Sequence, residues 1–98
     1  MKMTRALQFV PAGSTTARSI EVSISLPTRD EDDNWWALLE VVGFDEPYSK
    51  RIPGADAIQA VLSAAGLVPH LVAAMAKGGR VTLDGNEDLG FRLAGGSS

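Results

Sequence analysis

The segment Gly54–Lys77 constrains the fold more than any other, because its length and periodicity are those of a helix. Apolar residues recur at Ile58, Val61, Leu62 and Ala65, which is the i, i+3, i+4, i+7 spacing of one helical face. We therefore expect these four side chains to pack on a core. The many alanines of the segment make the helix slim enough to lie close to a sheet.

The ends and the middle of this segment carry signals of their own. Asp56 is the expected N-cap, and Gln59 follows at the spacing of a capping box. Pro69 lies inside the segment, where a proline removes one backbone hydrogen bond at a cost of about 3 kcal/mol. We expect a kink there, or two helices of about Asp56–Ala65 and Pro69–Lys77. The second part then presents its large apolar residues to the core: Val68, Leu71, Val72 and Met75.

The stretches before and after this segment read as strands. Arg18–Leu26 alternates strictly between apolar and polar residues, as a strand with one buried face requires. Thr4–Val10 precedes it across the turn signal Pro11–Ser14, so the two strands should form an antiparallel hairpin. Thr28–Asn34 reads as a polar, acidic loop. Further strands are expected at Trp35–Val42, Tyr48–Ile52 and Arg80–Leu83.

The strand Trp35–Val42 has no clearly polar face. Trp35, Ala37, Leu39 and Val41 form one row, and Trp36, Leu38, Glu40 and Val42 form the other. Either the strand is central and covered on both sides, or the second row is an exposed apolar surface, which usually marks a contact site. A chain of 98 residues with one long helix has little to cover a second sheet face. Both interpretations stay open at this point.

Composition excludes several classes of function. The chain has no cysteine, which excludes disulfides and thiolate metal sites. Its formal net charge is −3 and its Lys and Arg residues are scattered, so nucleic-acid binding is not expected. The sequence indicates no membrane span and a poor signal peptide, and we expect a cytoplasmic protein.

Several short patterns, in order along the chain, resemble a family of small bacterial proteins known only as a domain of unknown function. The matching stretches are Arg5–Leu7, Ile24–Pro27, Trp35 after an acidic loop, Val41–Pro47, Gly54–Ala60 and Glu87–Phe91. Similar sequences usually run the helix without a proline, so Pro69 is a departure from the pattern. The resemblance implies four strands followed by the helix. It implies no activity and no catalytic residue.

Candidate chemical groups are few. His70 is the only histidine, and neither Ser63 nor Glu40 is placed by the sequence to act with it. Asp84–Asp88 opens like a calcium loop, but Leu89 occupies the glycine position and a strand precedes it. We expect no catalytic residue, no metal site and no cofactor.

The sequence therefore predicts an α+β fold over residues 1–93: a four- or five-stranded, mainly antiparallel sheet with one long or kinked helical segment on one face. Residues 94–98 should be a disordered tail. The leading functional hypothesis is a small acidic, non-enzymatic interaction protein, for which an immunity- or inhibitor-type role fits the size and charge. It would bind a protein partner, or itself, through Trp36, Leu38 and Val42.

The acidic loop has a role in the same hypothesis. Its four adjacent acids, Asp30, Glu31, Asp32 and Asp33, would steer a basic partner. Two alternatives remain. One is a ligand-binding or enzymatic module with a pocket where Tyr48, Lys50, His70 and an acid converge. The other is a structural subunit of a homo-oligomer.

Overall fold

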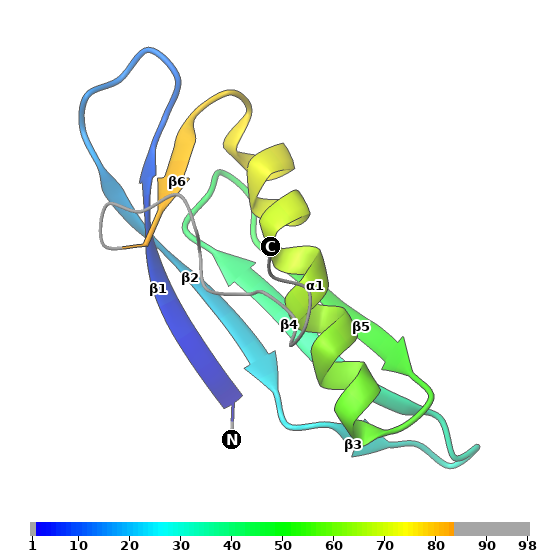
Figure 1. Ribbon diagram of the computed structural model, residues 1–98. Helices are drawn as coiled ribbons and strands as arrows, with labels where there is room; N and C mark the ends of the chain where they lie inside the picture. Colours follow the sequence, from blue (N-terminus) through cyan, green and yellow to red (C-terminus); the bar gives the residue numbers. More distant parts are fainter. Residues whose placement is uncertain (1, 84–98) are drawn as a thin grey trace.

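One antiparallel sheet of six strands and one helix make up the described part of the chain, residues 2–83 of a computed structural model (Figure 1). The helix lies on one face of the sheet. The α+β class and the order of strands, helix and final strand were both predicted, and both are confirmed. The elements are β1 (Lys2–Val10), β2 (Arg18–Ser25), β3 (Thr28–Arg29), β4 (Trp35–Val42), β5 (Tyr48–Gly54), α1 (Ala57–Ala76) and β6 (Arg80–Thr82).

The sheet is built outward from β4. β2 pairs with one side of β4 and β5 pairs with the other. β1 then pairs with β2 in the predicted hairpin, and β6 pairs with β1 at the far edge. The helix crosses the sheet from the β5 edge to the β6 edge (Figure 1). The expected turn at 84–87 and tail at 94–98 lie outside the described residues.

A two-residue strand, β3, was predicted as part of a loop. It continues along β4 beyond the end of β2, with Thr28 opposite Trp36. Pro27 interrupts the ladder between β2 and β3, because proline has no backbone N–H to donate. The Ser25 hydroxyl accepts a hydrogen bond from the backbone N–H of Leu38 at 2.8 Å, which satisfies a donor of β4 at this break.

The helix is continuous through Pro69. Of the two alternatives expected at this proline, a kink or two separate helices, the second was therefore wrong. Pro69 is exposed, while Val68 and Val72 on either side of it are buried against the sheet. Burying two valines contributes roughly 3–6 kcal/mol, which offsets the hydrogen bond lost at a proline inside a helix. Packing on the sheet therefore holds together a helix that its own sequence favours breaking.

In its first half the helix turns a different face to the core than the one predicted, whereas Val68 and Val72 of the second half are buried as predicted. Its buried residues follow a stripe spaced four apart: Ala60, Ala64, Val68, Val72 and Ala76. Ile58 and Leu62, predicted to be buried, are 72% and 43% exposed. Alanines in the stripe let the helix backbone approach the sheet closely, and the larger side chains are then displaced to its flanks.

The start of the helix forms as the sequence predicts. The Asp56 carboxylate accepts a hydrogen bond from the backbone N–H of Gln59 at 2.8 Å. The Gln59 side-chain oxygen accepts one in return from the backbone N–H of Ala55 at 2.6 Å. These reciprocal bonds satisfy donors that a helix N-terminus otherwise leaves without a partner.

By length and composition alone, α1 is apolar enough to cross a membrane, which the sequence analysis had not indicated. A core helix that is mostly buried passes the same test, but only 22% of the apolar window of α1 is buried. Here α1 packs on a core of strand residues that belong to the inner face of the sheet: Leu7, Phe9, Ile20, Val22, Ile24, Ala37, Leu39, Val41 and Ile52.

Candidate functional site: the outer face of the sheet

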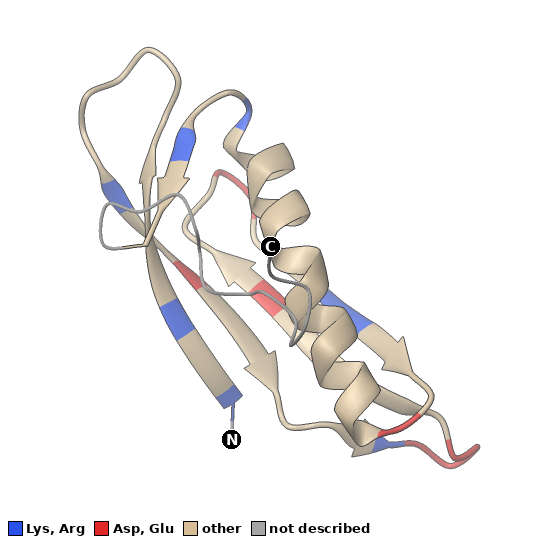
Figure 2. Ribbon diagram, in the orientation of Figure 1, with Lys and Arg blue, Asp and Glu red and all other residues tan. Residues whose placement is uncertain are grey.

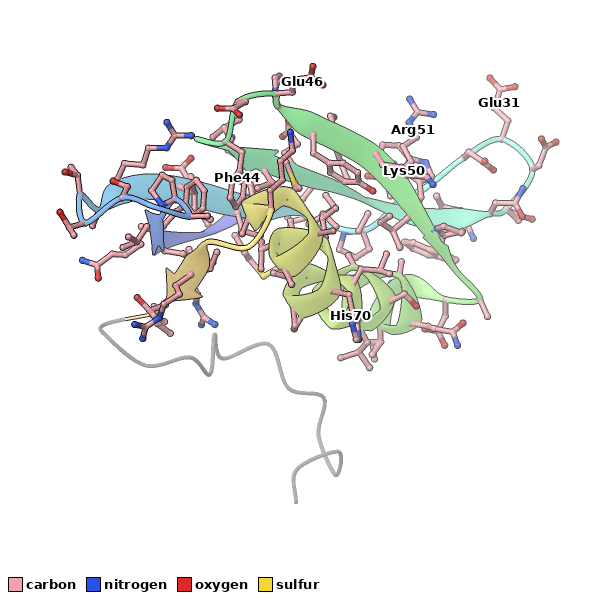
Figure 3. The ribbon with its side chains drawn as sticks, turned by 90° about the horizontal axis from the view of Figure 1, so that it is seen from above. Glu31, Phe44, Glu46, Lys50, Arg51 and His70 are labelled. Atoms are coloured by element: carbon pink, nitrogen blue, oxygen red, sulfur yellow. The ribbon has the colours of Figure 1, made fainter. Side chains whose placement is uncertain are left out.

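The two rows of β4 differ in what covers them. Ala37, Leu39 and Val41 of the inner row are fully buried beneath α1. The outer row points away from the helix, and none of the helices or strands formed by residues 2–83 covers that face (Figure 3). The apolar residues of the outer row are therefore buried only as far as their neighbours within the sheet allow.

Trp36 and Leu38 lie together at one end of this outer face, and both are half-buried. Trp36 stands opposite Thr28 of β3 and Pro53 of β5, and Leu38 stands opposite Arg51. The Arg51 guanidinium carbon lies 4.4 Å from the centroid of the Trp36 ring, within the range of a cation–π contact. We call this cluster of Trp36, Leu38, Arg51 and Pro53 the Trp36 patch.

The Trp36 patch contains an unsatisfied donor. The indole Nε1 of Trp36 is buried and has no hydrogen-bond partner among residues 2–83. A buried donor without an acceptor costs roughly 1–3 kcal/mol, and such groups are rare in native structures. Trp36 is thus a large aromatic residue on an uncovered sheet face whose polar atom still lacks an acceptor.

Val42 does not join this patch. Glu40 lies between Leu38 and Val42 in the outer row, and its cross-strand neighbours Ser23 and Ser49 are polar. Val42 is 45% exposed and stands opposite Glu21. The three apolar residues named from the sequence therefore fall into a pair and a separate single residue.

The acidic residues 30–33 form the tip of the connection between β3 and β4, at the same end of the sheet as Trp36 (Figure 2). Asp30 shapes this tip, because its carboxylate accepts hydrogen bonds from the backbone N–H groups of Asp32 and Asn34 at 2.9 and 3.0 Å. Asp33 has a positive φ of 61°, and its carboxylate Oδ1 lies 3.4 Å from the Arg29 Nε. The loop thus holds its exposed acids beside the Trp36 patch.

Two members of the patch, Arg51 and Pro53, were not identified from the sequence. Their place depends on the register between β4 and β5, which puts Arg51 opposite Leu38. The only signal in the sequence was the alternation within Tyr48–Ile52. This alternation places Arg51 on the face opposite to Tyr48, Lys50 and Ile52, but it does not show which residues of β4 lie next to Arg51.

The residues of the predicted pocket do not come together. His70 is exposed on the side of α1 away from the sheet, whereas Lys50 lies on β5 (Figure 3). Tyr48 packs against the core. One hollow, of about 400 Å³, lies instead beside the β4–β5 connection and the end of α1, lined by Phe44, Asp45, Glu46, Met75 and Lys77.

No metal-binding cluster is present among residues 2–83, where His, Asp and Glu residues do not gather in groups of three or more suited to an ion. This includes the acidic loop, where the Asp30 carboxylate is already engaged by backbone donors. The calcium-like stretch Asp84–Asp88 lies outside the described residues.

Comparison with known proteins identifies the family. The model of a family described as "Domain of unknown function (DUF6968)" matches residues 3–93. The chain belongs to this family. The match confirms the resemblance to a domain of unknown function noted from the sequence, and it covers every helix and strand apart from Lys2 at the start of β1. No curated protein matches the chain, and no solved structure does.

Proposed function

We propose that this DUF6968 protein is a small, acidic, non-enzymatic interaction module that binds a basic protein partner through the outer face of β4. The observation that supports this most is Trp36, an aromatic residue on an uncovered sheet face with a buried indole N–H that lacks an acceptor. Tryptophan is among the residues most often found at the centre of binding sites.

The position of the acidic loop supports a basic partner. Four adjacent acids at the tip lead through Asn34 directly into Trp35 and Trp36. Charges at the rim of an interface attract the partner and raise the association rate more than they raise the affinity. The loop would therefore guide the partner while the Trp36 patch makes the close contact. An immunity- or inhibitor-type role is compatible with this arrangement by analogy.

The enzymatic alternative has no specific support in the arrangement of side chains. Tyr48 and Lys50 share the inner face of β5, whereas His70 lies on the side of α1 away from the sheet (Figure 3). The cytoplasmic location and the absence of a nucleic-acid partner stay predictions from composition.

The test uses the chain as bait in extracts of its native host. Wild type is compared with Trp36→Asp and with Gln8→Asp, a matched control at an exposed position on the far end of the same sheet face. A partner captured by wild type and by Gln8→Asp but not by Trp36→Asp supports the proposal. Equal capture by all three proteins, each shown by circular dichroism to be folded, contradicts it.

A second variant distinguishes attraction of the partner by the acidic loop from close contact with the Trp36 patch. Glu31→Gln together with Asp32→Asn removes two exposed negative charges without touching the Asp30 carboxylate that holds the loop. We expect a several-fold slower association at low salt, with little change in dissociation, and no difference from wild type near 1 M salt. An association rate that does not change at low salt contradicts the steering role.

A further inference from the structure

The unsatisfied indole N–H of Trp36 limits the kind of partner that the Trp36 patch can bind. A partner that covered the patch without an acceptor would leave this buried donor unpaired, at the full cost of its desolvation. The partner must therefore place an acceptor, such as a carbonyl oxygen, beside the indole N–H. A carboxylate is a poor choice for this acceptor, because the acidic loop beside the patch repels it.

Arg51 is the part of the patch that a partner can displace. Its guanidinium lies over the Trp36 ring, but the residue is exposed and takes part in no ion pair among residues 2–83. A cation–π contact at an exposed site is weak, so Arg51 can turn away at small cost. We expect this movement to open the ring face and the approach to the indole N–H.

The backbone conformation of the bound segment follows from where a free carbonyl can come from. An α-helix already uses its carbonyl groups in internal hydrogen bonds. A β-strand needs a free sheet edge, and at Trp36 the strand β4 is paired with β3 on one side and with β5 on the other. A polyproline II segment has no internal hydrogen bonds, so its carbonyls are free. Because proline has no N–H, a proline-rich segment also brings no donor that would be buried without a partner.

The apolar surface of the patch suits proline rings. Pro53 is exposed and stands opposite Trp36, and Leu38 follows Trp36 in the outer row of β4. Proline-rich segments bind on aromatic surfaces of this kind, and they lose little conformational entropy because they are already extended before they bind.

The acidic loop indicates where the positive charges of such a segment lie. Glu31 of the loop and Arg51 of the patch both project from the side of the sheet opposite α1 (Figure 3). Asp33 precedes Trp36 by three residues, which is at most about 10 Å of extended chain. A polyproline II segment covers about the same distance in three residues, at about 3.1 Å each. An Arg or Lys about three residues from the proline at Trp36 therefore reaches the exposed acids, and it avoids the positive charge of Arg51.

We propose that the Trp36 patch binds a proline-rich segment of the partner in the polyproline II conformation, with Arg or Lys at the end nearest the acidic loop. This rests on the proposed function, since it concerns the same site, and it adds the conformation and composition of the bound segment. The prolines supply carbonyl acceptors and ring contacts at Trp36, while the flanking cations meet the exposed acids.

Two synthetic peptides test the proposal on the purified chain. Both are capped decapeptides that begin with two arginines. Eight prolines follow in the first peptide, and alternating alanine and serine follow in the second, so the two have equal length and charge. We expect wild type to bind the proline peptide at least about 10-fold more tightly than the alanine–serine peptide, in titrations at one salt concentration.

Variants at the patch show whether the proline peptide binds at Trp36. Trp36→Asp should bind it at least about 10-fold more weakly, and Gln8→Asp should bind it as wild type does. Arg51→Ala should bind it at least as tightly as wild type, because no side chain has to be displaced. A proton–nitrogen correlation spectrum reports the hydrogen bond itself: the indole N–H signal that is missing in Trp36→Phe should move downfield when the peptide is added to wild type.

Removal of charge from the loop tests where the arginines lie. Glu31→Gln together with Asp32→Asn should bind the proline peptide several-fold more weakly than wild type at low salt. A peptide of eight prolines without arginine should bind the two proteins equally. Equal affinity of the two proteins for the arginine-bearing peptide would show that its charged end does not lie over the loop.

The results that overturn this proposal differ from those that contradict the proposed function. Equal affinity of wild type for the two decapeptides, or no binding of the proline peptide at millimolar concentration, overturns the proline-rich segment. An indole signal that does not move, or weaker binding by Arg51→Ala, overturns the arrangement at Trp36. The proposed function stands in all these cases, because it fails only if Trp36→Asp captures the host partner as well as wild type does.

Discussion

Replacing Gly54 with alanine tests how closely the helix lies on the sheet. A Cβ atom at this position would fall 2.6 Å from the Ala60 Cα and 2.7 Å from the Gln59 carbonyl carbon, and closer still to the Ala60 backbone nitrogen. Ordinary contacts between carbon atoms are about 3.5–4.0 Å, so the overlap is about 1 Å. All three obstacles are backbone atoms, which cannot move aside as a side chain can.

Relief of this overlap requires the start of α1 to move away from the end of β5. Ala60 and Ala64, which are fully buried, would lose part of their contact with the sheet. A gap of 0.5–1 Å already removes about a quarter to a half of the dispersion energy of a contact. Overpacking of this kind lowers the free energy of unfolding by about 1–3 kcal/mol. Because the overlapping atoms belong to the backbone, we expect Gly54→Ala to lose about 2–3 kcal/mol, the upper part of this range.

The assay is thermal unfolding followed by circular dichroism. A loss of about 2–3 kcal/mol should lower the melting temperature by roughly 10–20 °C in a domain of this size. Gly13→Ala is the control, because Gly13 has a positive φ of 76° but no atom within 4 Å of the added Cβ. It should cost about 1–2 kcal/mol through its backbone conformation alone. If Gly54→Ala is no more destabilising than Gly13→Ala, the close packing inferred for α1 is wrong.

Three further substitutions have expected outcomes in urea or thermal unfolding. Pro69→Ala should stabilise the protein by about 1–3 kcal/mol, because it restores one helical hydrogen bond, and a loss of stability would count against a regular helix there. Asp56→Ala should lower the free energy of unfolding by about 1 kcal/mol, because it removes the acceptor for the backbone N–H of Gln59. Asp56→Asn should lower it by less, and equal effects of the two substitutions would contradict the capping role. Arg51→Ala should lower the free energy of unfolding by about 0.5–1 kcal/mol, and in a Trp35→Phe background, where Trp36 is the only tryptophan, it should shift the emission to longer wavelength. Arg51→Lys should retain part of the contact, and an unchanged spectrum in Arg51→Ala would refute the stacking.

The strands were the most predictable part of the fold. In β2, Ile20, Val22 and Ile24 alternate with polar residues, and all three are buried as this alternation requires. Local sequence determines which face of such a strand is apolar, because successive side chains point to opposite sides. The two-residue β3 could not be found in this way, since its pairing with Trp35 and Trp36 depends on a neighbouring strand.

The packed face of the helix was less predictable. Val68 and Val72 are buried as predicted, but Ile58, Val61, Leu62 and Ala65, chosen for their helical spacing, are only partly buried or exposed. Alanines at 60 and 64 contribute little to an apolar pattern, but they determine how closely two backbones can approach. Which residues of this helix are buried depends on how closely the helix lies on the sheet. That distance is set by residues from several elements together and cannot be predicted from the helix sequence alone.

The candidate site also combines features that the local sequence predicts with features that depend on the pairing between strands. Trp36 and Leu38 are two residues apart in one strand, and their shared face follows from alternation alone. Arg51 and Pro53 reach the same place from β5, through a register that the sequence did not determine. Val42 shares the face by alternation, but Glu40 and its polar neighbours separate it from the other two.

The most direct test of the proposed function is the affinity of the captured partner for purified wild type, Trp36→Asp and Gln8→Asp, measured by titration calorimetry at one salt concentration. The proposal predicts that Trp36→Asp weakens binding at least about 30-fold, the equivalent of a hot-spot residue worth about 2 kcal/mol, and that Gln8→Asp binds as wild type does. Equal affinity of wild type and a correctly folded Trp36→Asp would show that the partner binds elsewhere and that the outer face of β4 is not the binding site.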